Sequence, residues 1–187
     1  MTTRTPPLVM TYTTTTPDPG DLRLGGPVEQ LSRGPARVAE ELCRLGVSCE
    51  VKEMPQSTRS AEEAAVAVGC DVAQIVKSLI FRTVPGDQAV LVLVSGADRV
   101  DEARLAEVVG GPVERATADF VRARTGYAIG GVPPVGHTAP VASFLDEHLL
   151  DHEVVWAAAG TPRAVFSIKP ADLLRVTAAE LVAVATG

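Results

Sequence analysis

One lysine of this chain stands in an unusually apolar setting. Lys77 lies within Ile75-Val76-Lys77-Ser78-Leu79-Ile80-Phe81, and only three of the 17 basic residues are lysines. Such a lysine either snorkels at the end of a strand or holds its ammonium at the rim of a pocket. In the second case, the compact charge could bind a phosphate or polarise an ester carbonyl.

A glycine- and proline-rich loop is the second segment that could carry chemistry. It reads Gly130-Gly131-Val132-Pro133-Pro134-Val135-Gly136-His137. The two glycines let the backbone approach a ligand closely, while the prolines stiffen the loop and remove two donors. The loop is therefore either a tight crossing between strands or a rigid wall whose amides bind a carbonyl oxygen. His137 would lie at its edge as a hydrogen-bonding group.

Other kinds of chemistry have weaker support. The chain has neither a G-x-x-x-x-G-K-S/T nor a G-x-G-x-x-G pattern, so we predict no nucleotide cofactor. His148-Leu149-Leu150-Asp151-His152 resembles a zinc motif, but the segment has room for about one helical turn between two strands. We therefore interpret it as exposed polar residues and predict no metal. A triad of Ser95, His137 and an acid lacks a nucleophile elbow around the serine.

The cysteines indicate a reducing compartment. Cys43, Cys49 and Cys70 show no C-x-x-C spacing, and their odd number leaves at least one unpaired. We interpret them as free thiols, which favours a cytoplasmic protein. The apolar runs are far shorter than a membrane span, and the N-terminus lacks a signal peptide, so we expect no membrane partner.

The elements that must position these residues predict an α+β domain around a curved, mostly antiparallel sheet or partial barrel flanked by helices. Ser60 to Glu63 forms a capping box before a helix that ends at Gly69. Turn signals separate two strands, 79–83 and 89–95, that should form an antiparallel hairpin. Further strands are expected over 47–52, 141–145, 153–158 and 164–168, and helices over 38–45, 102–109, 118–124, after Pro170 and after Thr177.

Composition and charge limit the size and the partners. The first residues are rich in threonine and proline, so we interpret residues 1–28 as a flexible tail and residues 29–187 as one domain. The formal net charge of -6 argues against a protein that covers long nucleic acid, and we expect no DNA binding.

The two chemical segments also carry a family resemblance. Gln74-Ile75-Val76-Lys77-Ser78-Leu79-Ile80-Phe81 and the loop from Gly130 to His137 resemble the YbaK/EbsC family, related to the editing domain of bacterial prolyl-tRNA synthetases. The likeness covers about residues 35–185, through Ala157-Ala158-Ala159-Gly160 and Pro170-Ala171-Asp172-Leu173-Leu174. It implies a trans-acting aminoacyl-tRNA deacylase that hydrolyses the ester of a mischarged tRNA and needs no cofactor.

The resemblance also assigns roles to residues. It implies that Lys77 is the functional cation and that the glycine/proline loop shapes the amino-acid pocket, with His137 either catalytic or structural. An aromatic pocket residue of the YbaK branch corresponds to Ser60, and an aspartate of that branch falls near Val165, which argues against cysteine specificity. The candidate substrate-binding residues are Gly130, Gly131, Val132, Pro133, Pro134, Gly136, His137, Ser60 and Ser78.

Three functions are therefore considered. The first is the deacylase, which would contact the aminoacylated acceptor end of a tRNA through a local cationic rim around Lys77 and Arg82. Such a small footprint is compatible with the acidic net charge. The second is a non-catalytic module that binds an aminoacyl-adenosine-like ligand or partners an aminoacyl-tRNA synthetase. The third is a general hydrolase of small esters or amides.

Overall fold

A computed structural model describes residues 31–187, so the expectation of a flexible tail over residues 1–28 lies outside the described residues. The helices are α1 (Arg33–Arg44), α2 (Ala61–Val68), α3 (Glu102–Val109), α4 (Ala118–Thr125) and α5 (Pro170–Thr177), with short 3-10 helices η2 (Val72–Gln74) and η3 (Glu147–Asp151). The strands are β1 (Val51–Glu53), β2 (Ile75–Thr83), β3 (Ala89–Ser95), β4 (Arg99–Val100), β5 (Val113–Arg115), β6 (Ala142–Asp146), β7 (Val155–Ala158), β8 (Ala164–Ile168), β9 (Glu180–Val182) and β10 (Ala185–Thr186).

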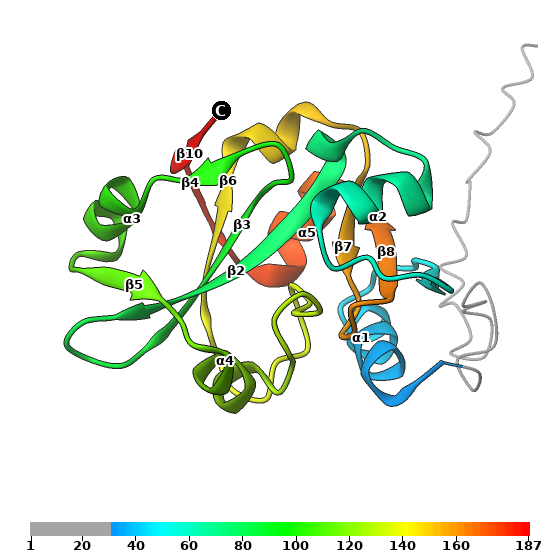
Figure 1. Ribbon diagram of the computed structural model, residues 1–187, viewed down its shortest axis with the longest axis horizontal. Helices are drawn as coiled ribbons and strands as arrows, with labels where there is room; N and C mark the ends of the chain where they lie inside the picture. The colour runs from blue at the N-terminus through cyan, green and yellow to red at the C-terminus, as the bar shows by residue number, and fades with distance from the viewer. Residues whose placement is uncertain (1–30) are drawn as a thin grey trace, which may run out of the picture.

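Eight of these ten strands form one curved, mixed sheet in which antiparallel pairs predominate (Figure 1). Its order is β1-β8-β7-β2-β3-β6-β9, with β5 also paired to β2, while β10 pairs separately with β4. The β2 and β3 strands form the expected antiparallel hairpin, and they are the long strands at its centre. The predicted α+β class with a mostly antiparallel sheet is therefore confirmed.

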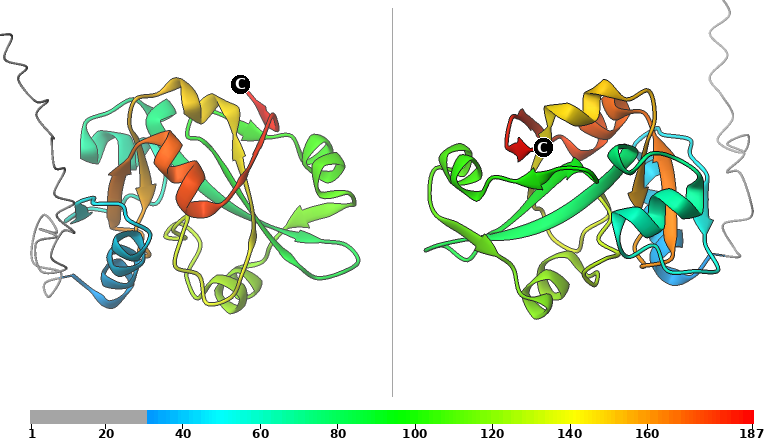
Figure 2. Two further views of the ribbon diagram at one scale, coloured as in Figure 1. Left: turned by 180° about the vertical axis from the view of Figure 1, so that it is seen from behind. Right: turned by 45° about the horizontal axis from the view of Figure 1, so that its top comes forward.

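Hydrophobic cores lie on both faces of β3. Leu91 and Leu93 belong to the larger cluster, whereas Val90, Val92 and Val94 belong to a second cluster. Successive side chains of a strand point to opposite faces, so this division shows that β3 is covered on both sides. The helices α2 and α5 lie over opposite faces of the sheet (Figure 2).

Local end signals explain the helix boundaries. The hydroxyl of Ser60 accepts from the amide of Glu63 and completes the predicted capping box of α2. Asp101 and Thr117 cap α3 and α4 in the same manner, as the sequence predicts. Gly69, Gly110 and Gly126 end these helices in the left-handed conformation.

The expected helix after Thr177 is wrong. The Thr177 hydroxyl donates to the carbonyl of Leu173 inside α5, and Ala178 then stops the helix with a φ of 47°. The following residues instead alternate between exposed and buried positions: Leu181 is 44% exposed, whereas Val182 is 8% and Val184 is 0% exposed. This period of two belongs to a strand, and β9 pairs in parallel with β6.

The strands also differ from expectation elsewhere, and the short strands β4 and β10 were not expected. Strand β2 begins at Ile75 rather than at Leu79, because Asp71 to Gln74, which has the pattern of a helix start, forms only the single turn of η2. The first strand is limited to Val51–Glu53, the stretch that pairs with β8. Strand β5 was not expected, and it is held by its pairing with the end of β2. Within residues 31–187, the structure has no helix that is long and apolar enough to cross a membrane.

Candidate functional site

A gap in the sheet lies along one edge of β2. On this edge, Ile75 and Val76 pair with β7, and Phe81 to Thr83 pair with β5. Within residues 31–187, no strand pairs with the stretch 77–80 between them, although its other edge is fully paired with β3. The stretch exposes a short piece of strand edge between two covered ends, which is a place where a ligand can meet the backbone.

The main-chain groups of Ser78 face this gap. Gly96 N donates to Ile75 O at 2.6 Å and Thr83 N donates to Gln88 O at 3.0 Å, so the main-chain N–H and C=O groups of the odd-numbered residues of β2 point toward β3. On the other edge, Ala116 N donates to Ile80 O at 3.2 Å, so the main-chain groups of the even-numbered residues point toward the edge that has the gap. The hydroxyl of Ser78 is also buried without a hydrogen-bond partner among residues 31–187. Ser78 therefore presents several polar atoms that the described part of the protein does not use.

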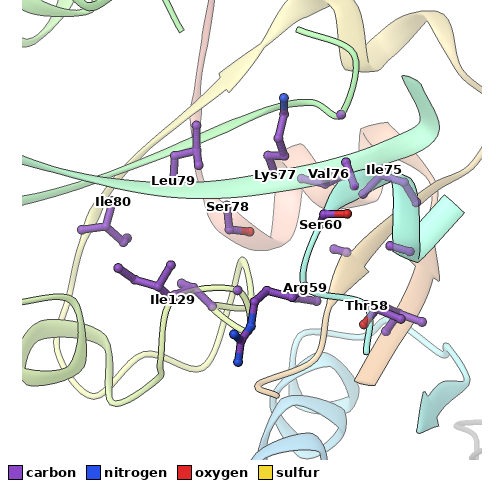
Figure 3. A pocket seen from close by; sticks show the side chains of 18 of the residues that line it. Thr58, Arg59, Ser60, Ile75, Val76, Lys77, Ser78, Leu79, Ile80 and Ile129 are labelled. Atoms are coloured by element: carbon purple, nitrogen blue, oxygen red, sulfur yellow. The ribbon is translucent and has the colours of Figure 1, made fainter. Parts of the chain in front are cut away.

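A cavity of about 470 Å³ opens at this gap. Its polar and charged lining residues include Arg59, Ser60, Glu62, Lys77, Ser78 and Arg115, and its apolar lining residues include Ile80, Val121, Ile129, Val132, Trp156 and Val165. Figure 3 shows that Ser78 and Ile80 project from β2 on the side of Ile129 and Arg59, whereas Lys77 and Leu79 project from the opposite side. The cavity thus combines an apolar wall with polar groups from both faces of one strand.

The Lys77 ammonium is held at the turn between β3 and β4. It donates to the main-chain carbonyl of Asp98. Burial lowers the pKa of Lys77, an effect that the nearby charges of Asp98 and Glu62 oppose and that of Arg99 reinforces. A partly desolvated ammonium interacts more strongly with an anionic group than a solvated one does, because water screens it less.

The glycine/proline loop packs closely against neighbouring segments at Gly130 and Gly131. A Cβ on Gly131 would lie 2.7 Å from the carbonyl carbon of Thr161, so only glycine fits there. The Gly131 amide donates to Ala128 O at 3.0 Å, and it is therefore already engaged within the loop. Gly130 has a φ of +84°, and it packs against the Arg59 side chain. A Cβ added to Gly130 would lie 2.7 Å from Arg59 Cγ. Gly130 and Val132 line the cavity at the gap.

The end of the loop faces a different cavity. His137 lines a second cavity of about 550 Å³ together with Pro134, Gly136, Arg37 and Glu41. Because a carbonyl oxygen only accepts, His137 Nε2 must donate in its 2.7 Å contact with Pro133 O. Burial lowers the pKa of His137, which favours the neutral ring. The structure thus separates His137 from Lys77 and places it where it closes the loop on itself.

Ser60 lies where the cavity meets the start of α2. Its hydroxyl accepts from Glu63 N at 3.2 Å, so this side chain is engaged in capping the helix. Thr58, two residues earlier, joins the same segment to the loop after β7 through its amide, which donates to Pro162 O at 2.7 Å. The segment around Ser60 and the loop around Gly131 therefore meet at Thr161 and Pro162.

We expect Ser60→Ala to lower the free energy of unfolding by about 1 kcal/mol, because the first turn of α2 loses its capping acceptor. Chemical denaturation of the two proteins measures the difference. Val66→Ala is the matched control on the same helix, since Val66 is 84% exposed and alanine favours a helix. Equal losses in both variants would contradict the capping role.

The structure brings together further residues that sequence reasoning missed. Arg59 and Arg115 line the cavity, whereas Arg82 does not and instead pairs with Asp87 and Glu114. The only sequence signal for Arg59 is its place next to the capping box. No local pattern could show that Arg115 lies at the cavity, because its position depends on the pairing of β5 with β2.

A cluster of metal-ligating residue types includes Asp98, the residue whose carbonyl accepts from Lys77. One possible ligand atom from each of Asp98, Asp146 and His148 falls within 4.8 Å of the others. His148 Nδ1 contacts Asp98 Oδ2 at 2.9 Å, and Asp146 accepts from the amides of Val184 and Ala185. These contacts describe a hydrogen-bonded cluster that includes His148 of the zinc-like sequence pattern but not His152.

The described part of the chain places no activated nucleophile at the cavity. The Ser95 hydroxyl donates to Ala73 O at 2.9 Å and is buried, and His137 lies at the other cavity. Burial raises the pKa of Cys49 to about 11, so its thiol stays protonated near neutral pH. What the site offers is one fixed cation, an open strand edge and an apolar wall.

An α+β fold with a cavity at a gap beside a central strand, lined by a lysine and a glycine loop, is of the editing-domain type. Residues 55–176 match the family described as Aminoacyl-tRNA editing domain, and the chain belongs to this family. The YwhH protein of Bacillus subtilis (strain 168), which is uncharacterized, is 30% identical over 124 residues, covering 66% of this chain and 78% of that protein.

Solved structures show the same fold. A protein described as a candidate trans-editing enzyme for prolyl tRNA synthetase is 49% identical with a TM-score of 0.79, over 84% of this chain and 99% of that one. The hypothetical protein APE2540 is 30% identical with a TM-score of 0.76, over 80% of this chain and 99% of that one. The resemblance to editing domains expected from the sequence is confirmed, and it supports a role in tRNA editing.

Proposed function

We propose that this protein acts in trans as an aminoacyl-tRNA deacylase, which hydrolyses the ester between a wrong amino acid and the terminal adenosine of a tRNA. One observation carries the proposal: the cavity at the gap in the sheet is lined by Lys77 and by Ser78, whose hydroxyl is buried without a hydrogen-bond partner among residues 31–187. A relative that is 49% identical is described as a candidate trans-editing enzyme, which supports the same reaction.

The reaction needs few groups from the protein. Water adds to the ester carbonyl, the bond to the ribose oxygen breaks, and a proton passes to that oxygen, releasing a free amino acid and an intact tRNA. The developing oxyanion is stabilised by positive charge and by donors fixed in advance. Lys77 supplies the charge. The donors are the Ser78 amide, which faces the gap at the edge of β2, and the Ser78 hydroxyl, which projects from the face of β2 opposite Lys77. A substrate hydroxyl, rather than a protein nucleophile, assists the water.

The surroundings of the cavity favour a small footprint on the tRNA. Its cationic lining residues are Lys77, Arg59 and Arg115, while the whole chain has a formal charge of -6. Three cationic residues along one cavity can contact a few phosphates at an acceptor end, although Arg115 also pairs with Glu102 at 2.9 Å. An acidic protein does not bind long nucleic acid strongly. The proposed partner is therefore the aminoacylated end of the tRNA, either alone or presented by an aminoacyl-tRNA synthetase.

A panel of mischarged tRNAs tests this function. We expect the protein to deacylate at least one tRNA of the panel and to leave the correctly charged tRNA intact. Tight binding of an aminoacyl-adenosine analogue without turnover on any tRNA would support a binding module instead. Hydrolysis of small model esters at rates equal to those of the tRNA substrates would support a general esterase.

Ser78→Ala separates a role in the site from a role in the fold. The Ser78 hydroxyl has no partner in the described part of the chain, so its removal costs the folded protein no hydrogen bond there. We expect an unchanged or slightly higher midpoint of thermal unfolding and a loss of about tenfold in kcat/KM, as for one missing hydrogen bond in the transition state. Full activity would remove the hydroxyl from the proposed site.

A further inference from the structure

A series of polar contacts links Lys77 to a histidine far away in the sequence. The main-chain carbonyl of Asp98 accepts from the Lys77 ammonium, and the carboxylate of the same residue contacts His148 Nδ1 at 2.9 Å. Because a carboxylate only accepts, His148 Nδ1 carries the proton in this contact. Asp98 is 8% exposed, so both contacts lie at a largely buried residue.

The turn that carries Asp98 is rigid on its other side. The Ser95 hydroxyl donates to Ala73 O at 2.9 Å and accepts from Ala97 N at 3.2 Å. The Asp98 amide donates to Ser95 O at 3.1 Å. These bonds fix the start of the turn, while the contact of Asp98 with His148 fixes its end.

His148 is itself anchored to the core. Its amide donates to Asp146 Oδ1 at 3.1 Å, and the carboxylate of Asp146 is 1% exposed. Asp146 Oδ2 accepts from the amides of Val184 and Ala185, each at 2.8 Å. The same ring nitrogen, His148 Nδ1, therefore lies near two carboxylates, 2.9 Å from Asp98 Oδ2 and 3.7 Å from Asp146 Oδ1. Hydrogen bonding to Asp98 and the charges of Asp146, Asp98 and Asp151 raise the pKa of His148, and burial opposes this shift.

We propose that Asp98 and His148 are positioning residues for Lys77: their contact holds the turn between β3 and β4, whose carbonyl fixes the Lys77 ammonium at the cavity. A free lysine side chain loses rotamer entropy when it binds. An ammonium that is already fixed by one N–H directs its other two toward a substrate without that cost. This inference rests on the role proposed above for Lys77.

Lysine side-chain NMR tests the positioning without any substrate. The chain has three lysines, and Lys52 and Lys169 are exposed, so the ammonium of Lys77 is the one expected to be protected from solvent exchange. We expect His148→Ala to abolish this protection. His148→Asn, which keeps a donor near the position of Nδ1, should restore it. His152→Ala is the control, because it removes a histidine from the same segment but outside the cluster.

Kinetics test whether the effect passes through Lys77. With a mischarged tRNA of the panel that the protein hydrolyses, we expect His148→Ala to lower kcat about tenfold with a smaller change in KM, and His148→Asn to recover most of the loss. In a Lys77→Ala background, adding His148→Ala should cost nothing further, because residues that act as one unit are not additive.

Clear outcomes would overturn the proposal. Protection of Lys77 that survives His148→Ala, an equal effect of His152→Ala, or full additivity with Lys77→Ala would show that His148 does not position the lysine. If His148→Ala does not fold, Asp98→Asn weakens the same contact while keeping its shape, and the same loss of protection is expected. If no tRNA is deacylated, the proposed function fails, yet the NMR result still decides the positioning.

Discussion

Lys77→Ala should lose at least about 100-fold in kcat/KM for deacylation, with little change in the midpoint of thermal unfolding. Removing one fixed group that stabilises an oxyanion costs about 100- to 1,000-fold in other hydrolases. The folded protein loses one contact, to the Asp98 carbonyl, and the Lys77 side chain is only partly buried. Single-turnover hydrolysis of a mischarged tRNA measures the effect.

Lys169→Ala is the matched control for this experiment. Lys169 is exposed and precedes α5, away from the cavity, so its loss should leave hydrolysis unchanged. Activity of Lys77→Ala within twofold of the unmodified protein would exclude Lys77 from the reaction. A large loss in both variants would instead indicate that overall positive charge governs tRNA binding.

The alkaline limb of the pH profile should also report on Lys77. Burial is the largest influence on this group, and it lowers the pKa of Lys77 below the usual value for lysine. The ammonium is present below its pKa and is lost as the pH rises through it, so activity should fall at a lower pH than an ordinary lysine predicts. Lys77→Arg keeps its positive charge over the same pH range. Its remaining activity, measured after subtraction of uncatalysed hydrolysis, should therefore not fall at alkaline pH.

Gly96→Ala is expected to destabilise the fold more than any other change considered above. A Cβ on Gly96 would lie 2.3 Å from the carbonyl oxygen of Val72 and 3.0 Å from the Cβ of Ala61. Neither is the end of a flexible side chain, so the turn after β3 must move. We expect a loss of about 3 kcal/mol, at the upper end of overpacking costs, and a midpoint about 6 to 12 °C lower.

Gly111→Ala provides the control, because no heavy atom lies within 4 Å of a Cβ at Gly111 and its φ is not in the left-handed region. Its midpoint should stay within about 2 °C of the unmodified protein. Differential scanning calorimetry of both variants measures the contrast. A Gly96→Ala protein as stable as Gly111→Ala would show that the turn near Asp98 is not tightly packed.

Much of the architecture follows from short-range signals in the sequence. The capping serine at Ser60, the caps at Asp101 and Thr117, and the turn between β2 and β3 all specify local structure by contacts within a few residues. The apolar run of β3 predicts a buried strand, and the structure buries it on both faces. Capping hydrogen bonds and side-chain alternation depend on residues that are close together in the sequence, so they can be predicted from short segments of it.

The end of the chain shows where local signals fail. Thr177 and Glu180 have the spacing of a capping box, yet the chain there leaves α5 and forms β9. The deciding contacts are the pairing with β6 and the burial of Val182 and Val184, which involve residues more than 30 positions away. Burial of apolar surface outweighs a capping bond of about 1 kcal/mol.

The sequence by itself determined the chemical groups: a lysine in an apolar strand, a serine beside it and a rigid glycine loop. Only the tertiary structure decided how they are arranged. Strands β7 and β5 cover the two ends of one edge of β2, which leaves Ser78 at a gap, and His148 reaches Asp98 across 50 residues. Such arrangements depend on which distant segments pair and which surfaces become buried, and these are properties of the whole fold rather than of any short segment.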